Sequence, residues 1–304
     1  MFRIFSALII LSIAMFALAC EGDDSPMTPD VGSGSGDSSS SCGTFAYSDT
    51  LFFLREQATD YIESPVTALS GSFGAVPAGL SINAATGDIN VSQSDTGVKY
   101  EVFYVPTGTT DTCRIKVIIS GINYLSGVRI LDNNDTLAIP FYNGQQGLLP
   151  PCSDDDDDDD DDDNDCEFDD GNDDDDGDGF GDEPPAGQQI RPQGIDINVA
   201  TGTINLKQTV ANGTFGAIPV SGTVKSVRLY YRINDASNGA LDFIDLDLYY
   251  YDSLSQVPAS LIAETTGKNG ALLRRRNPIQ QKNRQMARYK PRPPALVIVN
   301  RATR

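Results

Sequence analysis

The chain has 304 residues, with 43 acidic and 22 basic side chains, a formal net charge of −21, five cysteines, and neither histidine nor tryptophan. The absence of histidine excludes a Ser-His-Asp or Cys-His nucleophile and every zinc site built on histidine. So acidic a chain is not expected to bind nucleic acid, because the phosphates would repel it. The length accommodates one or two domains of ordinary size.

Residues 1–19 predict a secretory signal peptide. Arg3 supplies a positive charge, and an apolar stretch from Ile4 to Ala19 follows, interrupted by two serines. A helix of this length spans only about 24 Å, which is less than the ~30 Å hydrocarbon core of a bilayer. The stretch is therefore typical of a cleaved signal and not of a permanent transmembrane helix.

Cys20 follows directly after small residues, and this junction resembles the lipobox of bacterial lipoproteins. Ala17 stands where that family usually has leucine. The resemblance implies that Cys20 is lipidated and anchors the chain to the Gram-negative outer membrane, facing the periplasm or the cell surface. The acidic residues 21–24 are similar to surface-export signals of Bacteroidota lipoproteins. The alternative is an ordinary signal peptide with an incidental cysteine.

Residues 20–41 are rich in Ser, Gly and Asp and are expected to be a flexible tether. Four cysteines remain if Cys20 carries lipid. In an oxidising compartment they could form the disulfides Cys42–Cys113 and Cys152–Cys166, which is one of three possible pairings. Free buried thiols are the alternative, and a metal-thiolate site is not expected because no Cys-x-x-Cys pair exists.

Residues 42–150 show the pattern of a β domain. Apolar side chains alternate with others from Val98 to Tyr104 and again from Ile115 to Ile119, the period expected of strands with one buried face. Gly, Asn, Asp and Pro interrupt the strand-like segments at intervals that suit an antiparallel β-sandwich. No long helical period is visible, so the fold class predicted is all-β.

The segment Pro77–Ile89, PAGLSINAATGDI, is similar to a signature of the immunoglobulin-like and cadherin-like repeats of bacterial surface proteins. The resemblance covers roughly residues 44–120 and implies an immunoglobulin-like sandwich. Physically the segment predicts a hairpin: a strand ends at Asn83, Gly87 turns the chain with a positive φ, and Ile89 begins the return strand.

Residues 190–266 predict a second β domain. Gly194–Asn205 repeats the hairpin motif, and two alternating segments follow, joined by a loop that contains Asn238-Gly239. Two related β-sandwiches are therefore the leading architecture. One feature disagrees with a simple duplication: Gly71–Pro77 precedes the first hairpin motif, whereas the similar Gly213–Pro219 follows the second.

Residues 151–189 form an Asp-rich linker between the domains or a long loop inserted into the second one. Its uninterrupted run Asp154–Asp163 has no glycine to bend it and is expected to be an extended acidic spacer. Residues 172–183 differ, since glycines alternate there with aspartates. This stretch resembles the calcium-binding core of the thrombospondin type 3 repeat and also fits an EF-hand-like loop without flanking helices.

Alternate carboxylates on a curved loop can converge on one hard cation, and the glycines allow that curvature. We therefore expect calcium as the cofactor and coupling between binding and ordering. A diffuse acidic spacer is the alternative. The predicted metal ligands are Asn172, Asp174, Asp176, Asp178, Asp182 and Glu183.

Residues 267–304 carry eleven basic residues and no acidic one, and four prolines discourage a long helix. A basic, disordered tail is the expectation, with one short strand at Val297–Val299 as a possibility.

The leading functional prediction is a non-catalytic lipoprotein of the cell envelope, stabilised by calcium, that acts in adhesion or as a structural spacer. Its partners would be the membrane, through the lipid, and a surface protein or glycan. The alternative is a glycan-binding or accessory surface lipoprotein that presents Tyr249–Tyr251 to a sugar, although such tyrosines are more often part of a core. A carboxylate-based hydrolase is a third class, without a marked catalytic pair.

Overall fold

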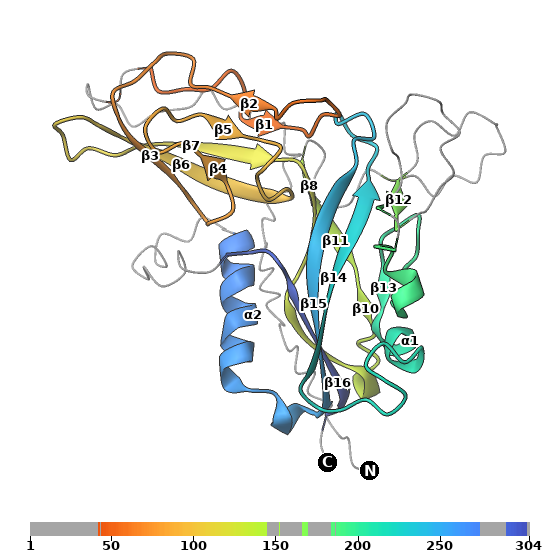
Figure 1. Cartoon of the computed structure of the whole chain (residues 1–304). Coiled ribbons are helices and arrows are strands. Elements are labelled where there is room, and N and C mark those ends of the chain that lie inside the picture. Colours follow the sequence, from red (N-terminus) through yellow and green to blue (C-terminus); the bar gives the residue numbers. More distant parts are fainter. Residues whose placement is uncertain are drawn as a thin grey trace, which may run out of the picture. The chain divides into compact units, whose positions relative to one another are not determined.

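The computed structural model describes residues 42, 44–144, 152, 166–169, 184–185, 187–273 and 290–302. Within these residues, strands predominate and form several hydrogen-bonded sheets, accompanied by two α-helices (Figure 1). The predicted all-β class is confirmed at this level. The sheets are not purely antiparallel, because β1 pairs with β7, and β16 pairs with β15 and β9, in parallel.

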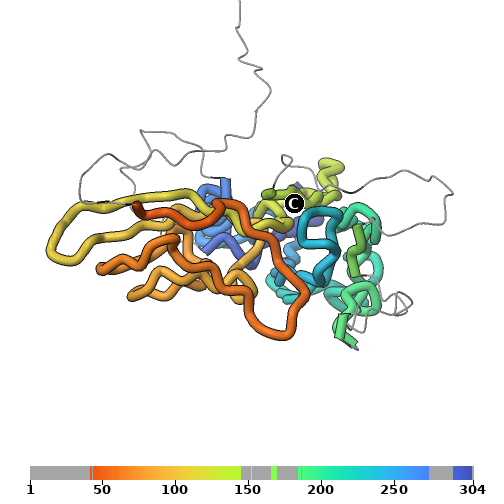
Figure 2. Tube along the Cα trace, turned by 90° about the horizontal axis from the view of Figure 1, so that it is seen from above, coloured from red at the N-terminus to blue at the C-terminus, as the bar shows by residue number. Residues whose placement is uncertain are grey.

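Residues 42–119, here called the N-terminal unit, contain a sheet with the strand order β1-β7-β6-β3 and a second sheet with the order β2-β5-β4. The trace of this unit is drawn in orange to yellow in Figure 2. The strands are β1 Leu51–Phe52, β2 Ile62–Glu63, β3 Gly71–Val76, β4 Ser81–Ile82, β5 Ile89–Asn90, β6 Val98–Pro106 and β7 Cys113–Ile119.

The alternation predicted for β6 is confirmed. Every second side chain of the strand is buried: Val98, Tyr100, Val102 and Tyr104. These side chains share one hydrophobic core with Ile89 and Val91. Ile89 lies in β5 of the other sheet, and Val91 follows directly after that strand. The two sheets of the N-terminal unit are thus held together by apolar burial, the main favourable term in folding.

Residues 121–302, here called the C-terminal unit, contain a sheet with the order β12-β14-β15-β16-β9 and the pairs β8–β11 and β10–β13. The strands are β8 Gly121–Tyr124, β9 Gly127–Ile130, β10 Leu137–Ala138, β11 Pro140–Asn143, β12 Glu167–Phe168, β13 Ile204–Asn205, β14 Thr223–Arg232, β15 Asp242–Ser253 and β16 Ala295–Arg301. The helices are α1 Leu206–Ala211 and α2 Ala259–Leu272, with short 3-10 turns η1 Leu131–Asn133, η2 Arg191–Gln193 and η3 Leu254–Gln256.

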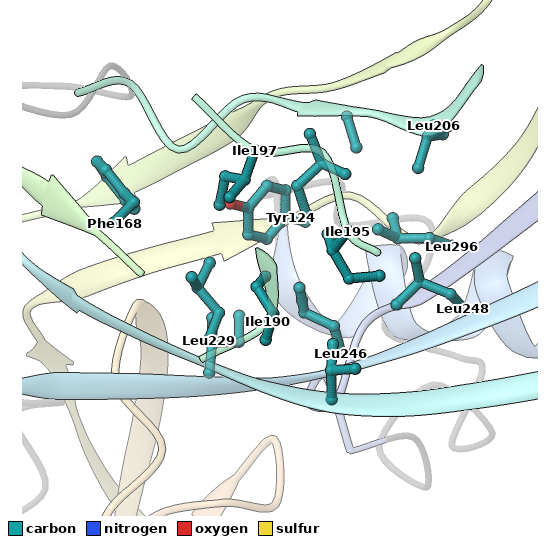
Figure 3. Close-up of a cluster of buried hydrophobic side chains, with 14 of the residues drawn as sticks. Tyr124, Phe168, Ile190, Ile195, Ile197, Leu206, Leu229, Leu246, Leu248 and Leu296 are labelled. Carbon is teal, nitrogen blue, oxygen red and sulfur yellow. The ribbon is translucent and has the colours of Figure 1, made fainter. Parts of the chain in front are cut away.

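The core of the C-terminal unit is built from side chains far apart in the sequence (Figure 3). Tyr124 comes from β8, Phe168 from β12, Leu229 from β14, Leu246 from β15 and Leu296 from β16, and all are fully or almost fully buried. The predicted β14–β15 hairpin is confirmed, with positive φ angles at both Asn238 and Gly239 in its loop.

The boundary between the two units lies near Ser120 and not at residue 150 as the sequence suggested. Residues 121–144 belong to the C-terminal unit because Ile122, Tyr124 and Tyr142 are buried in its core. The resemblance to immunoglobulin-like repeats also ended near residue 120. Composition placed the boundary at the Asp-rich stretch, whereas the division of apolar side chains between two cores places it earlier.

The first hairpin motif folds as predicted. Oδ1 of Asn83 accepts hydrogen bonds from the amides of Ala85 and Thr86 at 2.9 and 3.2 Å. The carbonyl of Asn83 accepts the amide of Gly87 at 2.8 Å. Gly87 has φ +79°, a conformation that favours glycine, and β4 and β5 pair antiparallel on either side of the turn.

The second hairpin motif repeats these contacts in the C-terminal unit. Oδ1 of Asn198 accepts the amides of Ala200 and Thr201 at 3.0 and 2.9 Å. Its carbonyl accepts the amide of Gly202 at 2.8 Å, and Gly202 has φ +66°. The likeness of the two motifs in the sequence therefore reflects a likeness in hydrogen bonding.

The two turns also have matching surroundings. Tyr47 donates its hydroxyl to the carbonyl of Gly87, and Tyr124 donates to that of Gly202, each at 2.6 Å. A phenylalanine ring lies against each turn glycine, Phe73 in the N-terminal unit and Phe168 in the C-terminal unit. Each ring stacks on a tyrosine directly across the sheet. The two hairpins thus have the same kind of aromatic neighbours in the N-terminal and the C-terminal unit.

Strand order extends the correspondence. The N-terminal sheet runs β3-β6-β7-β1, and the C-terminal sheet runs β12-β14-β15-β16-β9. The two orders match if β16 is an additional strand between β15 and β9. The similar segments Gly71–Pro77 and Gly213–Pro219 do not correspond: the first forms β3, whereas the second is a turn after α1.

The expectation of a disordered basic tail is wrong for residues 290–302. Residues Ala295–Arg301 form β16, and its first five side chains are fully buried. The apolar run 295–299 makes this strand, in spite of the basic residues around it in the sequence. Helix was underestimated in the same region, since α2 carries the chain from the end of β15 to the face of the sheet (Figure 1).

Candidate functional site

Both predicted disulfides are present. Cys42 bonds to Cys113 with a Cα–Cα distance of 5.5 Å and a sequence separation of 71 residues. Cys152 bonds to Cys166 with a Cα–Cα distance of 5.1 Å and a separation of 14 residues. The first joins the start of the N-terminal unit to β7. The second ties together the two ends of the segment that contains the run Asp154–Asp163.

The described residues on both sides of the Asp-rich segment belong to the C-terminal unit. Strands β8 to β11 precede the segment and β12 follows it, and all of them belong to the C-terminal unit. The Cys152–Cys166 disulfide joins the two described cysteines that flank the aspartate run in the sequence.

The six predicted metal ligands, Asn172, Asp174, Asp176, Asp178, Asp182 and Glu183, lie outside the described residues, as does Cys20. The residues on either side of the predicted calcium loop are described. Asp169 is fully buried and accepts the amide of Ile190 at 2.6 Å through Oδ1 and the amide of Arg191 at 2.8 Å through Oδ2.

Asp169 and Ile190 bound the predicted calcium loop and are hydrogen-bonded to each other. The two described residues that flank segment 170–189 in the sequence therefore lie next to each other, directly after β12. Phe168, which directly precedes this point, is fully buried in the core. Fixed ends reduce the chain entropy that a metal-binding loop must lose when it closes around an ion.

The described residues hold no group of three or more His, Cys, Asp or Glu side chains arranged to bind a metal ion. Among the helices that the structure describes, none is long and apolar enough to cross a membrane.

A polar cleft lies where the N-terminal and C-terminal units meet. Its volume is ≈ 570 Å³, and its walls come from residues within 54–60, 92–96, 240–245 and 290–293. The loop 54–60 and the segment 92–96 belong to the N-terminal unit, and the other two segments belong to the C-terminal unit. Charged and amide side chains line much of the cleft, and Phe243 contributes an aromatic ring that is 41% exposed.

Arg292 connects the two units at this cleft. Its side chain is buried, and Nη1 donates to the carbonyl and the Oγ1 of Thr96 at 3.1 and 2.7 Å. Nη2 donates to the carbonyl of Phe243 at 2.7 Å. One guanidinium thus bridges the N-terminal and C-terminal units, a task for which its rigid fork of donors is well suited.

Tyr231 and Asp242 continue this network into the C-terminal core. The Tyr231 hydroxyl lies 3.2 Å from Thr96 Oγ1, accepts the amide of Ile122 at 3.3 Å and donates to the Asp242 carboxylate. The other Asp242 oxygen accepts the amide of Phe243 at 2.7 Å. Both oxygens of this buried carboxylate are therefore engaged within the protein.

Burial controls the proton affinity of these groups. It raises the pKa of Asp242, and the nearby Arg292 guanidinium opposes that shift. Burial also raises the pKa of Asp95, opposed by Arg292 and Lys290. The Lys290 ammonium lies 3.2 Å from Asp95 Oδ2 as an ion pair, without the alignment of a hydrogen bond. Burial likewise raises the pKa of Tyr231 far above its ordinary range.

The arrangement favours binding and structural roles. Asp242 and Arg292 are engaged by protein groups, and Asp95 is paired with Lys290, so the network holds the two units together. The exposed side chains of Gln57 and Gln93 also line the cleft and could contact uncharged polar ligands.

The tyrosine platform considered in the sequence is not exposed. Tyr250 and Tyr251 are 3% and 8% exposed, and Tyr249 is only partly buried. Tyr250 packs against Phe215, and Tyr251 belongs to the cluster beneath α2. They are core residues of β15, as most tyrosines in such strands are.

Sequence reasoning missed the residues of the cleft. Arg292 stood in a segment taken for a basic tail, and Thr96, Tyr231 and Asp242 are distant from it in the sequence. The apolar run 295–299 was the one signal in the sequence. It predicts a buried strand, and Arg292 would then lie beside that strand in the folded chain and not in a tail.

Comparison with known proteins adds no functional assignment. No family model matches the chain, and no curated protein matches it. Conclusions about function therefore rest on the residues and contacts of the chain itself.

Proposed function

We propose that the protein is a lipid-anchored protein of the cell envelope, with a non-catalytic role in adhesion or as a structural spacer. The observation that carries the proposal is the pairing of Cys42 with Cys113 and of Cys152 with Cys166. Structural disulfides of this kind are typical of oxidising compartments outside the cytoplasm. Of the five cysteines, Cys20 then remains, at the position that the lipobox resemblance implies for lipidation.

Each unit is proposed to be an immunoglobulin-like β-sandwich. Support comes from the N-terminal unit, where seven strands form sheets of four and three around a shared core. Seven strands in two facing sheets are typical of constant-type immunoglobulin domains. The matching hairpins and strand order extend the proposal to the C-terminal unit.

Calcium is proposed to bind the loop 172–183. The spacing of aspartates and glycines supports this assignment. The hydrogen bonds from the amides of Ile190 and Arg191 to the Asp169 carboxylate also support it, because they hold together the residues that flank the segment. Calcium would relieve the repulsion between the carboxylates and order the loop. A millimolar affinity, typical of extracellular modules, would suit an ion that stabilises a surface protein.

Glycan binding is the second candidate function. The cleft between the two units favours it, because amide, hydroxyl and charged side chains surround one exposed aromatic ring. Ligand sites commonly lie at such junctions between domains. Screening the protein against a glycan array, with Phe243→Ala beside the wild type, tests this candidate. Loss of a detected signal on substitution would support it, and an array without signal would contradict it.

The leading proposal is tested by measuring lipidation at Cys20. The full chain is expressed in a Gram-negative host that is fed an alkyne-tagged fatty acid, and Cys20→Ala is compared with Ser40→Ala, a substitution in the same tether. Wild type and Ser40→Ala should incorporate the label and partition into detergent, while Cys20→Ala should do neither. Label retained by Cys20→Ala, or its absence from the wild type, would refute the lipid anchor.

A further inference from the structure

The strand β16 has no counterpart in the N-terminal unit. There, β1 pairs directly with β7, through Leu51 opposite Ile118 and Phe52 opposite Ile119. In the C-terminal unit, the corresponding strands β9 and β15 do not pair. β16 lies between them and is parallel to both. The related β unit is thus complete without such a strand, and β16 is an insertion into one of the two copies.

Both faces of β16 are buried. Leu296 and Ile298 enter the main core of the C-terminal unit, and Val297 and Val299 enter the smaller cluster beneath α2. All four side chains are fully buried. A strand that is apolar on both faces can only be stable inside a sheet, because exposing these side chains to water would cost about 1.5–3 kcal/mol for each.

The segment before β16 contacts both units. Arg292 bridges Thr96 and the carbonyl of Phe243. The carbonyl of Pro293 accepts the Lys268 ammonium of α2 at 2.6 Å. If β16 inserted into the sheet of another copy, residues 290–294 could make the same contacts there.

The connection to β16 is long. Sixteen residues separate Leu273, the last described residue after α2, from Lys290. The β16 strand of a second copy of the chain offers identical contacts. Whether a sheet binds its own β16 or that of another copy therefore depends on the local concentration of each strand.

We propose that β16 is an exchangeable strand, and that the β16 of one copy of this chain completes the five-stranded sheet of another. When β16 is absent from the sheet, the gap between its neighbours can be closed, because β9 could pair directly with β15 as β1 does with β7. Exchange between copies would produce closed dimers when it is reciprocal and longer assemblies when it is not. Copies brought close together on one surface would favour exchange.

Cysteine crosslinking between separate chains tests this proposal. Val128 of β9 lies opposite Val297 of β16. Val128→Cys and Val297→Cys are made in separate copies of residues 21–304, mixed in equal amounts, and refolded together in a redox buffer at increasing protein concentration. Exchange predicts a covalent heterodimer on non-reducing gels whose share rises with protein concentration, because the strand of a second copy competes by mass action.

Two controls make the result decisive. Val128→Cys mixed with Val224→Cys, whose new thiol would be exposed on β14 away from β9, measures random crosslinking. The double variant Val128→Cys/Val297→Cys should crosslink within one chain when dilute. The proposal is overturned if the first mixture gives no more heterodimer than the control mixture. Light scattering of the refolded wild type, which needs no crosslink, should show dimers at the same concentrations, and a persistent monomer there would equally overturn it.

Discussion

At the scale of single residues, the cleft between the two units depends on a few buried polar groups. Arg292, Thr96, Tyr231 and Asp242 come from four distant parts of the chain and satisfy one another. Removing one member would leave a buried polar partner unsatisfied, which costs more than a missing surface contact. Their chemistry is visible in the sequence, but their proximity is not, because it depends on where β16 inserts.

The protonation of Asp242 should leave a mark on stability. Burial raises the pKa of this carboxyl above its ordinary value of 3.8, so the folded chain binds the proton more tightly than the unfolded chain. That contribution to the free energy of unfolding is complete below the unfolded pKa and is lost as the pH rises through the folded pKa. The difference between wild type and Asp242→Asn should therefore fall as the pH rises from about 4 toward neutrality.

Asp88 offers a control of opposite sign. Hydrogen bonds from Ser64 and Thr86 lower its pKa, so its contribution is present above the unfolded pKa and is lost as the pH falls through the folded one. Urea unfolding at a series of pH values measures both differences. If the wild type and Asp242→Asn keep a constant difference while Asp88→Asn shows the opposite trend, burial of Asp242 does not raise its pKa in solution.

At the scale of elements, the two hairpins show what local sequence can and cannot predict. The Asn-to-Gly motif predicted the turn, the positive φ and the return strand, because all of these depend on residues within the motif. The phenylalanine against each glycine could not be predicted, since Phe73 and Phe168 arrive from different distances along the chain. The similar segments Gly71–Pro77 and Gly213–Pro219 even suggested a false correspondence.

Gly87→Ala should separate backbone strain from packing. A Cβ at Gly87 would lie 2.7 Å from the Phe73 ring, whereas a Cβ at Gly108, which has the same φ of +79°, would meet nothing within 4 Å. Gly108→Ala should thus cost only the left-handed conformation, about 1 kcal/mol. Gly87→Ala should cost about 2–4 kcal/mol, because overpacking adds to the strain. Equal costs in urea unfolding would mean that the ring yields freely.

At the scale of the whole molecule, the sequence predicted an all-β chain and two disulfides, and the structure confirms these. The boundary between the units and the place of the last strand were wrong. Both errors have one cause: charge and composition describe what surrounds a segment, whereas the core depends on a few apolar side chains within it, such as Ile122 and Tyr124 or Leu296 and Ile298. Residues 290–302 looked like a tail because their five apolar side chains stood among basic ones.

The described residues on either side of the predicted calcium loop, Phe168 and Ile190, are buried in the core of the C-terminal unit, so calcium should stabilise that unit. Asp169 directly follows the buried Phe168 of β12 and accepts a hydrogen bond from the amide of Ile190. For a dissociation constant of ~1 mM, ~10 mM calcium should add about 1.4 kcal/mol to the free energy of unfolding. Urea unfolding of residues 21–304, with calcium or with chelator, measures this gain.

Paired substitutions distinguish a discrete site from general acidity. Asp176→Ala/Asp178→Ala removes two predicted ligands, and Asp157→Ala/Asp159→Ala removes the same charge from the uninterrupted aspartate run. A discrete site predicts that the first pair abolishes the calcium-dependent gain and the second pair preserves it. Diffuse attraction predicts that both pairs reduce the gain slightly and alike, because screening depends on total charge and not on convergence at one ion. That second outcome would remove calcium as the ordering ion, while the lipid anchor and the two β units would stand.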